Sequence, residues 1–553
     1  MKSAAYFLLL AINLLPAGTL IVYSDITLES DQILLIFGSS LLSLICLGSV
    51  LARFPRTAIF IISILSIFAW IETVFIRKYG WSIDANTLSL IAETNPGEAA
   101  DIGNSIPLKW FAPIGILIAL GITAWRGSGS LTPELPLRRI AIYSLSGWLA
   151  TIAIAGFLGQ EPPWATDSTV FPLQKAGQEQ ALRAAFPAGL PWVAYDFVQE
   201  RAALSRAIEQ TKRFRFAMAP KGESPRRRIY VLVIGESSRA DHWSINGYAR
   251  ETTPRLKKED GLISFTRLYT PWTFTRLAVP LLITRKPPSV ASAVFNEASI
   301  VTAFKQAGFF TGWISLQASV GYHESPISLS AHQADEVRFL NPVDYRYRGQ
   351  HDDAAIPVMR EMISNTQRDS FIVVHLLGSH FRYADRYPAK FSVFQPDANG
   401  REQLFNPNDK TLLVNGYDNS ILFTDFVIDS LITTLRDQAN AETWLLYSSD
   451  HGEALFDDCR MQSGHGEYST ATQHVSALFW YSRNYQDSHP AQVEFMKKHK
   501  DSFASTAMFF ETMSDLADLN IVGNRHDNSL AAEPLRNPFE VRNAEQAFTC
   551  PSH

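Results

Sequence analysis

Three clusters of polar residues each follow a short apolar run, and their side chains are of types that bind metals. The first cluster contains Glu236, the second His380, and the third Asp450 with His451; a fourth, shortly after the third, contains His465. Carboxylate oxygens and imidazole nitrogens together suit a zinc-like ion. One such residue alone is usually a surface or structural residue. Clusters after several successive strands predict a shared metal site.

The apolar runs before these clusters predict the strands that must position them. The runs cover residues 229–235, 371–377, 444–447 and 477–481, with helical segments such as 421–436 between them. Continuous apolar runs of this length are typical of strands buried on both faces of a sheet. Their alternation with helices predicts an α/β domain with a mainly parallel sheet. Such sheets bind ligands beyond the carboxyl ends of their strands, where the polar clusters lie.

The front of the chain has a different composition. Residues 1–160 contain 18 charged residues, whereas residues 161–553 contain 85, so the front is about half as charged as the rest. A helix needs about 20 apolar residues to cross a bilayer. Five apolar stretches of roughly that length predict five membrane spans, at residues 4–23, 33–51, 57–75, 110–125 and 140–158.

Basic residues in the short loops predict the orientation of these spans. The cytoplasmic side collects Lys and Arg, and one side of the predicted topology holds Lys2, Arg53, Arg56, Arg126, Arg138 and Arg139. Arg77 and Lys78 lie on the opposite side and count against this orientation. An odd number of spans then places everything after about residue 160 in the periplasm of a bacterial cell, with the spans in the inner membrane.

The domain organisation follows from this topology. We expect a five-helix transmembrane domain over residues 1–160, a periplasmic connector over 161–225 and a periplasmic catalytic domain over 226–553. Aromatic residues such as Trp192 and Tyr195 favour amphipathic connector helices at the bilayer surface. A solvated linker helix is the alternative.

The overall composition excludes several classes of protein. With 30 Gly, 29 Pro and 3 Cys in 553 residues, the chain is not collagen-like, low-complexity or a disulfide scaffold. A net charge of −5 argues against a nucleic-acid-binding protein, which normally carries a basic surplus.

Several motifs together suggest a family. They are Ile-Gly-Glu-Ser-Ser-Arg-Ala-Asp around Glu236, Asn246-Gly247-Tyr248-x-Arg250-x-Thr252-x-Pro254, and Asp450-His451-Gly452-Glu453. In order and spacing they resemble the membrane phosphoethanolamine transferases of the sulfatase/alkaline phosphatase-like superfamily. The resemblance covers nearly the whole chain and implies an α/β alkaline phosphatase/sulfatase-like catalytic domain after the membrane helices.

The resemblance also implies a nucleophile. Residues 270–280 match the family pattern Thr-x-Thr-x-x-Ser-Val-Pro, which identifies Thr275 as the attacking residue and Thr273 as its neighbour. A threonine hydroxyl becomes a good nucleophile when a metal lowers its pKa. The alternative is that Thr273 and Thr275 only cap a helix that starts here.

The remaining site residues are carried over from the family one by one. The implied metal ligands are Glu236, Thr275, Asp450 and His451, holding one essential zinc ion and allowing a second. His380 and His465 match two histidines near the substrate phosphate, where one would stabilise the transferred group and the other would move a proton. Glu453, Thr273 and the loop acid Glu98 are implied near the substrate.

The sequence also departs from the family. The lipid A enzymes have cysteines around the nucleophile, where this chain has Trp272 and Leu281 or Leu282, and an Asn where it has Leu90. These departures favour the branch that modifies lipopolysaccharide core or periplasmic glucan. Since Cys46 lies in a predicted span, only Cys459 and Cys550 could pair in the periplasm.

The resemblance therefore implies a metal-dependent transferase that moves phosphoethanolamine from phosphatidylethanolamine to a lipopolysaccharide or glucan acceptor, through a phospho-threonine at Thr275. A phosphoglycerol transferase of the same superfamily and a non-catalytic membrane lipid sensor are the alternatives. A sulfatase would need a Cys or Ser in a Cys/Ser-x-Pro-x-Arg setting, which the residues after Thr275 do not provide.

Overall fold

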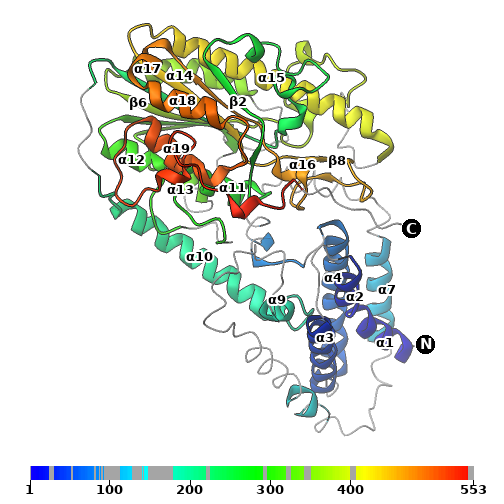
Figure 1. Ribbon diagram of the computed structural model, residues 1–553. Helices are drawn as coiled ribbons and strands as arrows, with labels where there is room; N and C mark the ends of the chain where they lie inside the picture. The colour runs from blue at the N-terminus through cyan, green and yellow to red at the C-terminus, as the bar shows by residue number, and fades with distance from the viewer. Residues whose placement is uncertain are drawn as a thin grey trace. The chain divides into compact units, whose positions relative to one another are not determined.

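The computed structural model describes residues 2–23, 30–51, 54–79, 82–85, 87–88, 91, 112–126, 140, 142–146, 178–218, 224–290, 295–318, 326–341, 350–398 and 407–545 (Figure 1). The chain forms two compact units, one of residues 1–92 with 106–201 and one of residues 93–105 with 202–553. Each unit is described separately below.

The first unit is helical. Its helices are α1 (Lys2–Ile12), α2 (Leu15–Tyr23), α3 (Ser30–Leu51), α4 (Pro55–Tyr79), α7 (Ala112–Arg126) and α9 (Gln178–Arg183), and α10 (Leu190–Arg213) continues into the second unit. Among the described residues, two segments are long and apolar enough to cross a membrane, Gln32–Leu51 in α3 and Pro55–Arg77 in α4. Two of the five predicted spans therefore form helices of suitable length and composition, and the five-span topology remains a prediction.

The first predicted span, residues 4–23, is divided between α1 and α2. Pro16 has no N–H to donate to the carbonyl of Ile12, so a regular helix cannot continue through this point. Asn13, at the break, is fully buried and donates from Nδ2 to Leu9 O at 2.7 Å and to Ser66 Oγ of α4 at 3.0 Å. The fourth predicted span forms the 15-residue helix α7, and most of the fifth lies outside the described residues.

The second unit is built around a seven-stranded mixed sheet with the order β2-β10-β7-β1-β6-β4-β5. The strands are β1 (Arg228–Gly235), β2 (Leu262–Phe265), β4 (Phe310–Ala318), β5 (Glu336–Asn341), β6 (Ser370–His375), β7 (Glu442–Ser449) and β10 (Ala477–Tyr481). Strands β7, β1, β6, β4 and β5 are parallel, while β10 is antiparallel to both β7 and β2. The predicted parallel arrangement is thus confirmed for the centre of the sheet but not for β10.

Helices cover both faces of this sheet (Figure 1). Alternate residues of β1 point to opposite faces, so Leu232 joins one apolar core and Val231 the other. The first core includes residues of α11 (Thr275–Ile283), α12 (Ile300–Gln306) and α19 (Phe509–Leu516). The second includes residues of α14 (Ala355–Ser364) and α15 (Lys410–Arg436), the latter containing the predicted helical segment 421–436.

Shorter elements complete the unit. They are β3 (Leu268–Tyr269), α13 (Pro326–Ala331), β8 (Ala454–Leu455), β9 (Ser463–Gly464), α16 (Thr470–Gln473), α17 (Arg483–Ser488), α18 (Pro490–His499) and β11 (Ala504–Ser505). β8 and β9 form a small hairpin after β7, and this hairpin carries His465 at its end.

Candidate active site

The carboxyl ends of β7, β1 and β6 bring the predicted polar clusters together. These three strands are direct neighbours, and Ile234 of β1 pairs with both Ser448 of β7 and His375 of β6. Because the strands are parallel and end at the same level, the residues that follow them meet at one edge of the sheet. The structure therefore confirms the predicted meeting of the clusters.

Thr275 is the first residue of α11 and directs its hydroxyl into this site. Its Oγ donates to Glu236 Oε2 at 3.2 Å and lies 3.1 Å from His451 Nε2. The residue before it, Phe274, occupies the N-cap position, where no side-chain capping bond is formed among the described residues. The Thr275 hydroxyl thus contacts the site rather than capping the helix, and the amides at the start of α11 would favour an anion nearby.

Glu236, Asp450 and His451 form a group that fits a metal ion. All three are buried, and one ligand atom from each lies within 4.8 Å of the others. His451 Nδ1 lies 2.9 Å from Gly452 O, which can only accept, so Nδ1 carries a proton and Nε2 is left as a metal ligand. That Nε2 lies 3.3 Å from Glu236 Oε1 and 3.4 Å from Asp450 Oδ2.

The electrostatics of this group also favour a cation. Burial opposes a charge on His451, yet Asp450 and Glu236 raise the pKa of its imidazole to about 10. Burial likewise opposes ionisation of Glu236, but the hydrogen bond and charge of His451 lower the pKa of this carboxyl. Burial and the negative charge of Glu236 raise the pKa of Asp450 to about 7. A positive charge between these side chains would relieve the repulsion between the two carboxylates.

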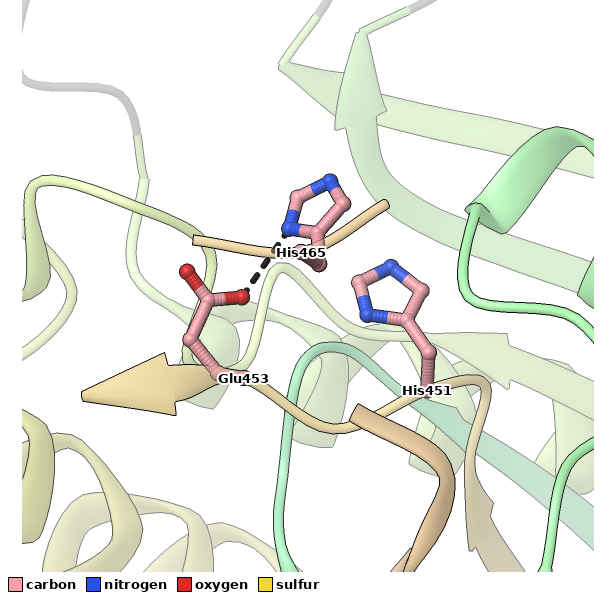
Figure 2. A group of neighbouring side chains, drawn as sticks. All are labelled: His451, Glu453 and His465. Carbon is pink, nitrogen blue, oxygen red and sulfur yellow. Dashed lines mark hydrogen bonds and ion pairs between the residues drawn. The ribbon is translucent and has the colours of Figure 1, made fainter. Parts of the chain in front are cut away.

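A second group, made of His451, Glu453 and His465, adjoins the first (Figure 2). Glu453 is fully buried; its Oε2 accepts from His465 Nδ1 at 2.9 Å and its Oε1 accepts from the Tyr383 hydroxyl at 2.8 Å. The His465 ring centroid lies 4.2 Å from that of His451. Because Nδ1 of His465 donates to Glu453, its Nε2 is left for a substrate, a proton or a second ion.

The structure describes some of the other predicted site residues but not all of them. His380 lies near His465, with ring centroids 6.5 Å apart, and burial lowers the pKa of its imidazole to about 4. Thr273 is fully buried, and its hydroxyl has no hydrogen-bond partner within the described part of the chain. Glu98 lies outside the described residues. Cys459 is disulfide-bonded, while its expected partner Cys550 also lies outside them.

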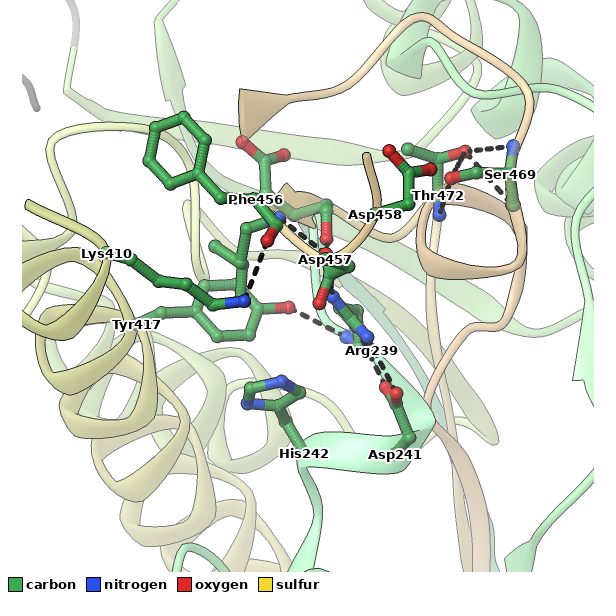
Figure 3. Close-up of polar contacts among 12 residues, drawn as sticks. Arg239, Asp241, His242, Lys410, Tyr417, Phe456, Asp457, Asp458, Ser469 and Thr472 are labelled. Atoms are coloured by element: carbon green, nitrogen blue, oxygen red, sulfur yellow. Dashed lines mark hydrogen bonds and ion pairs between the residues drawn. The ribbon is translucent and has the colours of Figure 1, made fainter. Parts of the chain in front are cut away.

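Arg239 is a structural centre of the site to which the sequence assigned no role (Figure 3). Its guanidinium donates to both oxygens of Asp241, to Glu453 O at 3.1 Å and to Asp457 Oδ2 at 2.8 Å. Its backbone N–H donates to the hydroxyl of Tyr417 in α15 at 2.9 Å. Arg239 thus ties the segment after β1 to the segment after β7, and only its place in the Glu-Ser-Ser-Arg motif could have drawn attention to it.

Gln317 and Tyr383 also contact the site without having been predicted. Gln317 Nε2 donates to Glu236 Oε2 at 3.3 Å and to Leu376 O at 3.0 Å. Gln317 comes from β4, a strand whose mixed polar and apolar sequence was not recognised as a strand. Tyr383 lies in a single 3-10 turn, for which the sequence carries little signal.

The sulfatase family matches residues 228–519 of this chain, the part that contains the mixed sheet and these clusters. The chain belongs to that family. Its curated relatives include phosphoethanolamine transferase EptC of Escherichia coli K12, 26% identical over 496 residues that cover 85% of this chain and 82% of the relative. Another is phosphoethanolamine transferase EptA of Salmonella typhimurium, 27% identical, covering 80% and 79% of the two chains. The predicted resemblance to phosphoethanolamine transferases is confirmed.

Solved structures agree with this assignment. The integral membrane lipooligosaccharide phosphoethanolamine transferase A of Neisseria meningitidis superposes with a TM-score of 0.68 over 96% of this chain and 98% of its own, at 18% identity, which shows the shared fold. The zinc complex of the C-terminal periplasmic domain of E. coli EptC has a TM-score of 0.53 and 26% identity, covering 59% and 91% of the two chains.

Proposed function

We propose that this protein transfers phosphoethanolamine from phosphatidylethanolamine to a lipopolysaccharide or glucan acceptor of the cell envelope. The observation that carries the proposal is the Thr275 hydroxyl, held at the start of α11 between Glu236 and His451. The choice of phosphoethanolamine as the transferred group rests on the phosphoethanolamine transferases among the relatives of this chain. Matching a full-length integral membrane transferase supports an inner-membrane protein whose catalytic domain is periplasmic.

Zinc is the cofactor that the donor set fits. Glu236, Thr275, Asp450 and His451 would hold one ion, and the zinc complex of a relative's periplasmic domain supports this choice. When bound, zinc supplies a positive charge that lowers the pKa of the Thr275 hydroxyl and stabilises negative charge on the phosphoryl group. Glu453 and His465 offer ligand atoms for a second ion, because Nε2 of His451 would already bind the first.

In the first step, Thr275 Oγ forms a bond to the phosphorus of the donor while the bond from phosphorus to the glycerol oxygen breaks. Glu236 Oε2, 3.2 Å from Thr275 Oγ, is placed to take up the Thr275 proton, while His451 Nε2 is kept for the metal. The glycerol oxygen takes a proton from His465 Nε2, and diacylglycerol leaves. Phosphoethanolamine remains on Thr275 as a phosphate diester.

In the second step, an acceptor hydroxyl or phosphate oxygen attacks the same phosphorus and the bond to Thr275 Oγ breaks, restoring the hydroxyl. His465, whose Nδ1 is bonded to Glu453, is oriented to move the proton of the acceptor or of the leaving oxygen through Nε2. His380, whose low pKa keeps it neutral, would donate a hydrogen bond to the transferred group.

The donor head group carries an ammonium, which needs an anionic or polar partner. We assign this role to Glu98 of the loop between the third and fourth predicted spans, and place Thr273 beside the bound phosphate. Both assignments come from the family resemblance.

We further propose the predicted domain boundaries, 1–160, 161–225 and 226–553, with the connector helices at the membrane surface.

Intact-mass and peptide mass spectrometry on the full chain, purified with phosphatidylethanolamine present, tests this proposal. We expect a phosphoethanolamine adduct on Thr275 that is absent from Thr275→Ala. A phosphoglycerol adduct would keep the mechanism and change the donor to that of the alternative transferase. No adduct in a zinc-loaded protein, with rapid hydrolysis excluded by acid quenching, would overturn the covalent mechanism and favour a lipid sensor.

A further inference from the structure

The carboxylate of Asp352 holds the loop that follows β6. Asp352 lies in the 3-10 helix Asp352–Ala354 and is 3% exposed. Its Oδ1 accepts from the N–H of Leu377 and its Oδ2 from the N–H of Gly378, both at 2.8 Å. Buried backbone N–H groups need acceptors, and beyond the end of β6 this carboxylate supplies both.

The opposite side of the same loop touches the backbone of Glu236. Ser379 N–H donates to Glu236 O at 2.9 Å. Gly378 has φ of +51°, and a Cβ at this position would lie 2.8 Å from Glu236 O and 2.9 Å from Glu236 N. Only glycine allows the loop to come this close, so any displacement of the loop would also displace Glu236.

The loop also leads directly to His380. The N–H of His380 donates to Leu377 O at 3.1 Å, which closes a turn whose first N–H is bound by Asp352. The two N–H groups that Asp352 binds therefore lie in the same short loop as Ser379, which binds Glu236 O, and as His380.

We propose that Asp352 is a positioning residue for the metal site: its carboxylate holds residues 376–380 against the backbone of Glu236, and thereby sets the place of the Glu236 ligand and of His380. Within the described part of the chain, the hydrogen bonds of the Asp352 carboxylate go to backbone N–H groups and not to the candidate metal ligands. The inference deepens the proposed function by naming what aligns its site, and its effect on zinc binding can be measured without the transfer reaction.

Asp425 provides a matched control. It is fully buried in α15, and its carboxylate accepts from two successive backbone N–H groups, those of Arg255 at 3.2 Å and Leu256 at 3.0 Å. These bonds fix a segment outside the catalytic clusters. Asp425 Oδ2 also accepts from the Arg255 N–H at 3.2 Å, so in either position Asn can turn an amide N–H toward a backbone N–H that the carboxylate had bound.

The experiment compares Asp352→Asn with Asp425→Asn in the full chain in lipid nanodiscs, using competition with a chromophoric chelator to measure zinc affinity. Both variants should melt at a lower temperature than the wild type. Asp352→Asn should weaken zinc binding about 10- to 100-fold, as loss of residues that orient metal ligands does elsewhere, while Asp425→Asn should leave it unchanged. Equal zinc affinities in the two variants would overturn the proposal.

Gly378→Ala keeps the test decisive if Asp352→Asn does not fold. The added methyl group would push the loop away from Glu236 from the other side, so it should also weaken zinc binding; an unchanged affinity would overturn the proposal. Transfer of phosphoethanolamine by zinc-saturated protein is measured in parallel. A wild type that binds zinc but transfers nothing would refute the proposed function, and the zinc affinities would still decide the role of Asp352.

Discussion

At the scale of single residues, the chemistry of the site depends on the side-chain atoms that are not already engaged in hydrogen bonds within the fold. His451 uses Nδ1 on Gly452 O and His465 uses Nδ1 on Glu453, so in both rings Nε2 remains for chemistry. Glu453 in turn is held by Tyr383. The orientation of the atoms proposed to react is therefore set by hydrogen bonds to neighbouring groups that take no part in the reaction.

We expect Tyr383→Phe to lower kcat for transfer about 10-fold with little change in KM, because Glu453 loses a donor and no longer holds His465 in one orientation. Tyr387→Phe is the control, since the Tyr387 hydroxyl donates to Asp397 Oδ2 at 2.9 Å in the same segment but outside the site. Steady-state kinetics of both variants check this. Equal rates would show that the Tyr383 hydroxyl has no part in orienting His465.

At the scale of elements, the sequence predicted the strands that carry the site better than those at the sheet's edge. β1, β6 and β7 are continuous apolar runs because both of their faces are covered. β4 and β5 include polar residues such as Gln317 and Arg338, so their pattern gave no strand signal. The direction of β10 depends on its pairing with β7, which its own residues do not encode.

Contacts between segments were the least predictable part of the site. Arg239 is adjacent in sequence to a recognised motif, but its partners Glu453 and Asp457 come from a segment more than 200 residues later. Asp352 lies outside every recognised motif and reaches the site through backbone N–H groups of any residue type. Residue type alone therefore could not identify either interaction.

We expect Arg239→Met to lower the free energy of unfolding by about 3 kcal/mol, because it removes a buried guanidinium whose bonds to Asp457 and Glu453 O join two segments of the site. Arg338→Met is the comparison: Arg338 is 49% exposed and pairs with Glu336 at the surface, so its loss should change the free energy of unfolding far less. Denaturant unfolding of both variants measures the difference. A similar loss in both would contradict a central role for Arg239.

At the scale of the whole catalytic unit, several carboxyl groups are buried away from the metal ligands. Burial raises the pKa of Glu511 to about 7, of Asp425 to about 7 and of Asp352 to about 6. A carboxyl with a raised pKa binds its proton more tightly in the folded state than in the unfolded state. Its contribution to stability is complete below the ordinary pKa and is lost as the pH rises through the raised one.

Glu511→Gln tests this pH dependence. Between about pH 4.5 and pH 7, the free energy of unfolding of the wild type should fall by up to about 3 kcal/mol more than that of the variant, since a shift of one pKa unit corresponds to 1.36 kcal/mol. Melting temperatures measured across this range for both proteins provide the check. Parallel curves would mean that Glu511 titrates normally in the folded protein.

The order of strands in the sheet also decides when the site can exist during synthesis. β7 inserts between β1 and β10, and the bond from Ser237 N–H to Asp450 Oδ1 joins residues 213 positions apart. Chains grow at about 5–20 residues per second, so Asp450 and His451 are synthesised at least several seconds after Glu236. A nascent chain that ends before residue 450 has the Glu236 carboxylate but lacks the other two candidate metal ligands, Asp450 and His451. If the proposed ion is zinc, its uptake would therefore be a late event that marks a completed catalytic unit.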